Sequence, residues 1–297
     1  LSKQKIVVKN LFGAISQPRG VFYRSSFLKT LEVSEFTNGL AEFLKHALLH
    51  SNQEFARVVH CVRIMHKQAI VQKKSTEAGY KAPACNFVQT ALQEKFTLHT
   101  FEQVISSARF KEWIVQESLR DRSNHCLRDI LNLGHTLGHA IESLLSLPHG
   151  VAVMHGVALE ALIMDQLLQD NSWQQDSKKS YFPWLSDWIY LIRTLYGNAF
   201  DITCRLEKTC KAPGKFLSLL GCDKKNQHQS LVFSCRGKKG VVDVHGSKEI
   251  SLGQASSASL CDYSMPVAIS HIIDLLVSVL PSYQAVLLDK GNVDVDS

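Results

Sequence analysis

The sequence predicts a mainly α-helical protein, and two observations support this fold class. Hydrophobic residues make up 45% of the 297 positions and charged residues 20%, which is the composition of a folded domain rather than of a disordered chain. Apolar residues recur at helical spacing through most of the chain, whereas strand-like runs are confined to residues 1–30 and 230–244. A chain of this length can bury a sizeable core.

The expected elements are helices separated by short breaks. Residues 1–30 combine strand-like runs with the turn SQPRG, and residues 230–244 indicate two short strands around a turn rich in glycine and lysine. Residues 51–105 are helical in pieces. Elsewhere apolar residues three and four positions apart predict helices over residues 34–50, with Ser34 as the N-cap, 101–119, 127–145, 151–168 and 181–197.

Charge and cysteine content narrow the function classes. The chain has 33 basic and 27 acidic residues, a net charge of +6, but its basic pairs are scattered, which favours a phosphorylated small molecule over nucleic acid as a partner. None of the eight cysteines forms a C-x-x-C pair, so we expect free thiols and a cytoplasmic protein. His271 and Asp274 interrupt the apolar run of residues 267–280, so we expect no membrane span.

A polar stripe in the helix expected over residues 127–145 carries the strongest chemical signal. On a continuous helix, five polar side chains would lie within about a quarter turn of one another: Arg128, Asn132, His135, His139 and Glu142. Burying such a stripe without partners would cost several kcal/mol, on the order of 2–7 for each neutral polar group, so it needs partners or a ligand.

Two glycines and a third histidine accompany this stripe. Gly134 and Gly138 each cost about 1 kcal/mol of helix stability relative to alanine, so something must approach the backbone there closely. His149 follows in a Pro-His-Gly turn. A lone H-x-x-x-H pair is more often a hydrogen-bonded part of a helical core, but this combination favours a functional site.

Spacing leaves two sets of metal ligands open. Zinc in a catalytic site commonly has three protein ligands and one open position, which His135, His139 and His149 could provide. The alternative set lies in the run EFLKHALLH, where three ligand residues follow one another at intervals of four: Glu42, His46 and His50.

The run LRDILNLGHTLGHAIE, followed by HGVAV, resembles the signature of the 3-dehydroquinate synthase family of sugar-phosphate cyclases. The runs KNLFGAISQP, FLKTL, GLAEFLKHALL and GCDKKN match the family in the same order, so the resemblance covers most of the chain. It implies the helical C-terminal domain of an α/β plus α fold. Residues 1–30 would be a remnant of the dinucleotide-binding α/β domain, and residues 31–297 the helical metal- and substrate-binding domain.

The resemblance also implies roles for individual residues. Zinc would be held by Glu42, His135 and His149, and His139 would handle protons beside the metal. The remaining implied catalytic residues are Lys45, Arg128 and Asn132. Substrate would be bound by Lys9, Asn10, Lys111, Lys224 and Lys225, with one of the last two lysines sufficing and Lys9 also contacting the cofactor.

The reaction that the resemblance implies converts 3-deoxy-arabino-heptulosonate 7-phosphate to 3-dehydroquinate in the shikimate pathway. NAD oxidises a ring hydroxyl transiently, phosphate is eliminated, the ketone is reduced again, and an aldol step closes the carbocycle. The expected cofactors are therefore zinc and NAD, and a homodimer is an option. Alternatives are another sugar-phosphate cyclase, a metal-dependent polyol dehydrogenase, or a non-catalytic zinc-binding relative.

The sequence departs from the family pattern in several places. No G-x-G-x-x-G or comparable glycine cluster occurs, Val151 stands where the family usually has glutamate, and the spacer from His139 to His149 is short. The region between Glu42 and His135 is longer than usual. We therefore expect this chain by itself to fold its helical domain and hold a metal, but to bind NAD weakly and turn over poorly or not at all.

Overall fold

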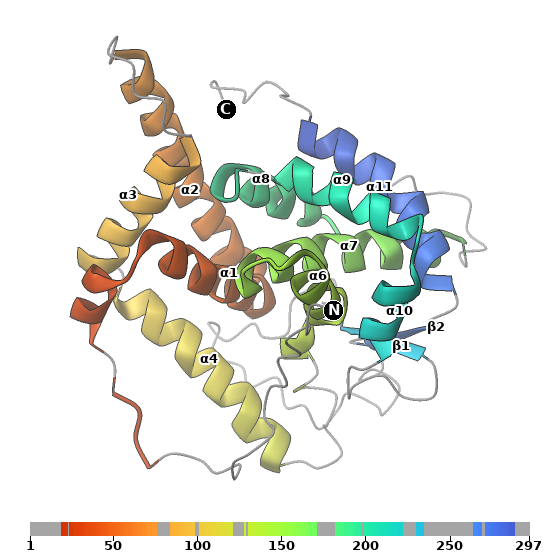
Figure 1. The fold of residues 1–297 in the computed structure, drawn as a ribbon. Helices are drawn as coiled ribbons and strands as arrows, with labels where there is room; N and C mark the ends of the chain where they lie inside the picture. The colour runs from red at the N-terminus through yellow and green to blue at the C-terminus, as the bar shows by residue number, and fades with distance from the viewer. Residues whose placement is uncertain are drawn as a thin grey trace, which may run out of the picture.

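The computed structural model shows a mainly helical protein, which confirms the predicted fold class (Figure 1). Most of the predicted α/β remnant, residues 1–18, lies outside the part of the chain that the structure describes. The proposed domain boundary therefore stays a prediction. The described residues are 19–22, 24–75, 84–98, 101–120, 128, 130–170, 182–197, 199–221, 230–234, 264–268 and 271–288.

Long helices supply nearly all of the described structure. Two short 3₁₀ turns, η1 (Ser25–Thr30) and η3 (Ile130–Asn132), precede α1 and α6. The α-helices are α1 (Val33–His50), α2 (Asn52–Ser75), α3 (Ala84–Leu98), α4 (Phe101–Arg120), α6 (His135–Leu145), α7 (His149–Asp170), α8 (Leu185–Leu195), α9 (Ala199–Cys210), α10 (Gly214–Gly221) and α11 (Ile272–Leu288).

Most predicted helices are confirmed within a few residues, with two corrections. Helix α1 is preceded by Glu32, without a side-chain cap, so the N-cap predicted at Ser34 is wrong. The continuous helix predicted over residues 127–145 is also wrong, because Gly134 adopts the left-handed conformation at φ 77° and α6 begins only at His135. Arg128 and Asn132 therefore do not share a helix with His135.

Two short strands form a small antiparallel sheet beside α10 (Figure 1). Strand β1 (Ser230–Ser234) confirms the first half of the hairpin predicted over residues 230–244. Its partner is β2 (Ser264–Ala268), which the sequence pattern did not indicate, and Ser230 lies opposite Ala268. Residues 235–244 lie outside the described part of the chain.

Helix α7 lies at the centre of the molecule, between α1, α6, α8 and α11 (Figure 1). Residues 152–161 are all buried, and Trp188 of α8 donates its indole N–H to the carbonyl of Met154 at 2.9 Å. By length and composition the stretch His149–Leu167 could cross a membrane, but 72% of its apolar window is buried within the protein. That burial is typical of a core helix.

Close backbone contact joins α6 to α7, and glycines make it possible. A Cβ atom on Gly134 would lie 2.8 Å from the Val153 carbonyl oxygen, and one on Gly138 would lie 3.3 Å from the Ala152 carbonyl oxygen. On the α7 side, a Cβ on Gly156 would lie 3.0 Å from the Gly138 nitrogen and closer still to the Gly134 carbonyl oxygen. The close neighbour predicted at Gly134 and Gly138 is thus a second helix, α7.

A buried polar pair joins α7 to α11. Tyr283 and His155 share a hydrogen bond of 2.8 Å, and neither side chain is more than 1% exposed. The His155 Nε2 atom has no hydrogen-bond partner among the described residues. Burial lowers the pKa of His155 to about 4, so the imidazole is neutral at physiological pH.

The cysteine prediction is confirmed where it is tested. Cys61, Cys204 and Cys210 carry free thiols in the described part of the chain. Cys204 and Cys210 are the closest cysteines in sequence, and both lie on α9 without forming a disulfide.

The space around two glycines, one inside the α6–α7 contact and one outside it, predicts opposite effects of a change to alanine. Gly156→Ala should lower the free energy of unfolding by about 1–3 kcal/mol, because the new methyl group meets backbone that cannot move aside. Gly39→Ala, inside α1 with no atom within 4 Å of the added Cβ, should raise it by about 0.5–1 kcal/mol. Urea unfolding followed by circular dichroism measures both, and equal stabilities would contradict the packing described here.

Candidate metal centre

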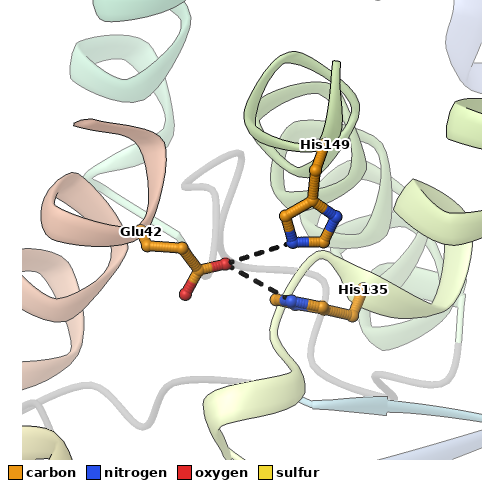
Figure 2. A group of neighbouring side chains, drawn as sticks. All are labelled: Glu42, His135 and His149. Carbon is orange, nitrogen blue, oxygen red and sulfur yellow. Dashed lines mark ion pairs between the residues drawn. The ribbon is translucent and has the colours of Figure 1, made fainter. Parts of the chain in front are cut away.

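One carboxylate and two imidazoles converge from three different helices (Figure 2). Glu42 lies in α1, His135 is the first residue of α6, and His149 is the first residue of α7. The Glu42 Oε1 atom is 3.3 Å from His135 Nε2 and 3.8 Å from His149 Nε2. The three residues that the family resemblance assigns to zinc therefore lie together.

These distances match the spacing of ligands around one small cation. Zinc binds nitrogen and oxygen at about 2.0–2.2 Å, so two ligand atoms of a tetrahedral site lie roughly 3.3 Å apart. The pair distances of 3.3 and 3.8 Å are close to this value. The residues present therefore fit a three-coordinate protein site with a fourth position left for a small molecule.

The charge state of these groups suits metal binding. Burial by itself would raise the pKa of the Glu42 carboxyl, but the neighbouring imidazoles of His135 and His149 and the charge of Lys45 outweigh it and hold the pKa far below its usual range. Burial lowers the pKa of His135 to about 4, against the opposing effect of Glu42. Near neutral pH both ligands are thus already deprotonated, so little proton release accompanies metal binding to them.

Lys45 brings a buried ammonium group to the same site. Its side chain is 1% exposed, and its Nζ atom lies 2.8 Å from Glu42 Oε2 and donates to the Leu131 carbonyl at 2.8 Å. The same atom is 3.3 Å from His135 Nδ1. A buried ammonium group needs such partners, and these contacts place the predicted catalytic lysine beside Glu42, one helical turn away, and beside His135.

Two side chains that the sequence analysis missed hold the helix ends in place. The carboxylate of Glu160 in α7 is fully buried and accepts the backbone N–H groups of Gly134 and Leu137, each at 2.9 Å, at the start of α6. The side-chain oxygen of Asn38 in α1 accepts the backbone N–H of Gly150 at the start of α7. Each contact fixes the helix end that carries one histidine of the candidate metal centre.

A sequence signal for one of these two residues existed. Glu160 is the only Asp, Glu, Lys or Arg between His149 and Asp165, in an otherwise largely apolar run. Because an unpaired buried carboxylate is very costly, a lone glutamate there predicts a backbone or cationic partner. Asn38 carries no comparable signal, since a single asparagine near the start of a helix is common.

The alternative set within α1 does not form a three-ligand group in the described part of the chain. His46 is buried, its Nδ1 atom lies 2.7 Å from the Ser107 hydroxyl, and its Nε2 atom is 3.9 Å from Glu42 Oε2. His50 turns away and packs against the ring of Phe110 with centroids 5.4 Å apart. Of this set, only Glu42 contributes to the metal centre.

His139 lies beside the metal centre. Its ring centroid is 5.1 Å from that of His135 and 5.8 Å from that of His149. With Glu142 and His149 it forms a second group of neighbouring ligand atoms, the only other such group among the described residues. The rings of His135, His139 and His149, the set predicted from spacing, thus lie close together. Each of the two groups whose ligand atoms could share an ion, however, contains a glutamate.

The other predicted site residues are placed only in part. Arg128 is exposed, Asn132 ends η3 and is half-buried, and Lys111 is exposed on α4. Val151, which replaces the usual glutamate, is half-buried in the first turn of α7. Four predicted substrate-binding residues lie outside the described residues: Lys9, Asn10, Lys224 and Lys225.

Comparison with known proteins gives one family. The family model described as 3-dehydroquinate synthase C-terminal matches residues 39–226, more than half of the chain, and this range includes all three metal-site residues. The 3-dehydroquinate synthase of Macrococcus caseolyticus (strain JCSC5402) is 30% identical over 227 residues, which are 76% of this chain and 50% of that protein. The chain thus spans about half the length of this relative.

The ligand assignment predicts which variants lose metal. Purified protein should retain about one zinc ion per chain after dialysis, whereas His135→Ala and His149→Ala should retain almost none, because each change removes one of three ligands. His46→Ala combined with His50→Ala should retain zinc. Elemental analysis of each variant, after circular dichroism has shown it folded, is the measurement. Zinc loss only in the His46 and His50 double variant would contradict the assignment.

Proposed function

The chain belongs to the 3-dehydroquinate synthase family, and we propose that it provides the zinc- and substrate-binding part of an enzyme with that activity. The reaction would be the NAD- and zinc-dependent elimination of phosphate from 3-deoxy-arabino-heptulosonate 7-phosphate, followed by cyclisation to 3-dehydroquinate. The observation that carries the proposal is the convergence of Glu42, His135 and His149, with the Lys45 ammonium group in contact with Glu42 and His135.

This arrangement suits a hydroxylated, anionic substrate. When bound, zinc supplies a Lewis acid that polarises substrate oxygen and eases loss of a proton and a hydride from the adjoining carbon. His135, His149 and Lys45 together keep the Glu42 carboxylate ionised, and Lys45 holds an N–H donor within the site. His139, whose ring lies 5.1 Å from that of His135, is the proposed proton carrier.

Formal charges support a link between metal and substrate. Counting Glu42 and Glu142 as anions and Lys45 as a cation, the site carries −1 without metal and +1 with a divalent ion. A doubly anionic sugar phosphate is therefore repelled from the empty site and attracted to the loaded one. Arg128 and Asn132 are proposed as further substrate ligands on the basis of the family resemblance alone.

The proposal divides the activity between regions of a longer protein. The reaction needs a hydride acceptor held against the reacting carbon, and such positioning can contribute roughly 7–11 kcal/mol of barrier reduction. No glycine-rich phosphate-binding run occurs in the sequence. We therefore propose that a region outside these 297 residues holds NAD in the complete enzyme.

Calorimetric titration of the zinc-loaded chain with the heptulosonate phosphate tests this function. Binding should require zinc and should weaken at least about tenfold in Lys45→Met, because a charge-assisted contact is worth about 1.5–3 kcal/mol. Lys211→Met, at an exposed position just after α9, is the matched control and should bind as the parent does. A zinc-loaded chain that does not bind at millimolar substrate would instead indicate a non-catalytic zinc-binding relative.

Adding NAD separates the two enzymatic alternatives. In the longer protein that also contains the proposed NAD-holding region, a synthase regenerates NAD in each turnover, so phosphate would be released without accumulation of NADH. A polyol dehydrogenase would accumulate NADH and release no phosphate. Absorbance of NADH and a phosphate assay, recorded in the same reaction, distinguish these outcomes.

A further inference from the structure

The imidazole of His149 presents its two nitrogens to two different carboxylates. Its Nε2 atom faces Glu42 Oε1 at 3.8 Å, on the side where His135 also lies. Its Nδ1 atom lies 2.7 Å from Oε2 of Glu142 in the last turns of α6. The family resemblance gives Glu142 no role, and the ligand geometry places it only in the alternative group with His139, yet its contact with this ring is shorter than that of Glu42.

The two distances have different chemical meanings. Two ligands on one tetrahedral zinc lie roughly 3.3 Å apart, so a separation of 2.7 Å is too short for Glu142 Oε2 and His149 Nδ1 to bind the same ion. It is the usual length of a hydrogen bond from a ring N–H to a carboxylate, about 2.7–2.9 Å. The Nε2 contact, by contrast, has the spacing of two ligands.

We propose that Glu142 is a positioning residue that accepts the Nδ1–H of His149 and so directs the Nε2 lone pair at the metal. This inference rests on the zinc site of the proposed function. A carboxylate on the far nitrogen fixes the tautomer and the ring orientation and makes the metal-binding nitrogen more basic. The Nδ1 atom of His135 lies instead between the Leu133 carbonyl oxygen, at 3.2 Å, and the Lys45 Nζ atom, at 3.3 Å.

His149 needs this support more than His135 does. The side chain of His149 is 30% exposed against 14% for His135, so packing restrains it less. Glu142 can reach it because the chain reverses between α6 and α7, with Ser146 in the left-handed conformation at φ 54°. The backbone N–H groups of Ser146 and Leu147 both donate to the Glu142 carbonyl, so the backbone of Glu142 shapes the turn and its side chain orients the histidine.

Because the turn is bonded through the backbone of Glu142, changes of its side chain should leave the fold intact and isolate the effect on metal. Glu142→Gln keeps an oxygen that can accept the N–H but loses the charge, so zinc affinity should fall about tenfold. Glu142→Ala removes the acceptor, and affinity should fall about 100-fold. Glu54→Gln, a glutamate of similar exposure on α2, should change nothing.

Competition with a zinc-binding dye measures these affinities, and the melting temperature of each metal-free variant shows whether the fold has changed. The proposal requires zinc affinity to fall in the order parent, Glu142→Gln, Glu142→Ala, with unchanged metal-free melting temperatures. If the parent binds zinc and Glu142→Ala binds it equally well, the role of Glu142 is refuted while the zinc site stands. If the parent itself does not bind zinc, the metal part of the proposed function fails instead.

A variant of His139 distinguishes positioning from direct ligation. If Glu142, His139 and His149 were the true ligands, His139→Ala and both Glu142 variants would abolish zinc binding alike, and Glu42→Gln would retain it. The proposal requires the reverse: Glu42→Gln loses zinc and His139→Ala keeps it. Either pattern decides the question.

Discussion

The close backbone contact between α6 and α7 is the constraint on which the rest of the site depends. Helices with larger residues at Gly134, Gly138 and Gly156 would separate by the width of side chains, and backbone atoms now in contact could not meet. The contact places the first residues of both helices, His135 and His149, with ring centres 5.3 Å apart. The distance between the two proposed zinc ligands is therefore a consequence of helix packing.

The starts of α6 and α7 are held by polar side chains of neighbouring helices rather than by local caps. Gly134, at the start of α6, has no side chain to cap the helix, and Glu160 of α7 supplies a carboxylate in its place. Asn38 does the same for α7 from α1, the helix that also carries Glu42. Helices α1 and α7 thus each hold the start of a neighbouring helix. Because those helix starts carry the two histidines, residues distant in sequence are brought together in one small site.

Sequence reasoning succeeded where the signal was local and failed where it depended on tertiary contacts. Helical spacing gave most helices, and the family resemblance selected Glu42, His135 and His149 where spacing alone left two sets open. The prediction that one polar stripe extends from Arg128 to Glu142 was wrong, because the left-handed Gly134 interrupts the helix on which that stripe would lie. Asn38 and the orienting contact of Glu142 could not be predicted, since both depend on how α7 meets its neighbours in space.

The central claim is that α1, α6 and α7 together form a single zinc site with Glu42, His135 and His149. Anomalous diffraction at the zinc absorption edge, from crystals of the zinc-loaded chain, tests it most directly. The account predicts one peak about 2.0–2.2 Å from a Glu42 oxygen and from the Nε2 atoms of both histidines, with Glu142 outside this distance. A peak bounded by His139, Glu142 and His149 Nδ1 would contradict it.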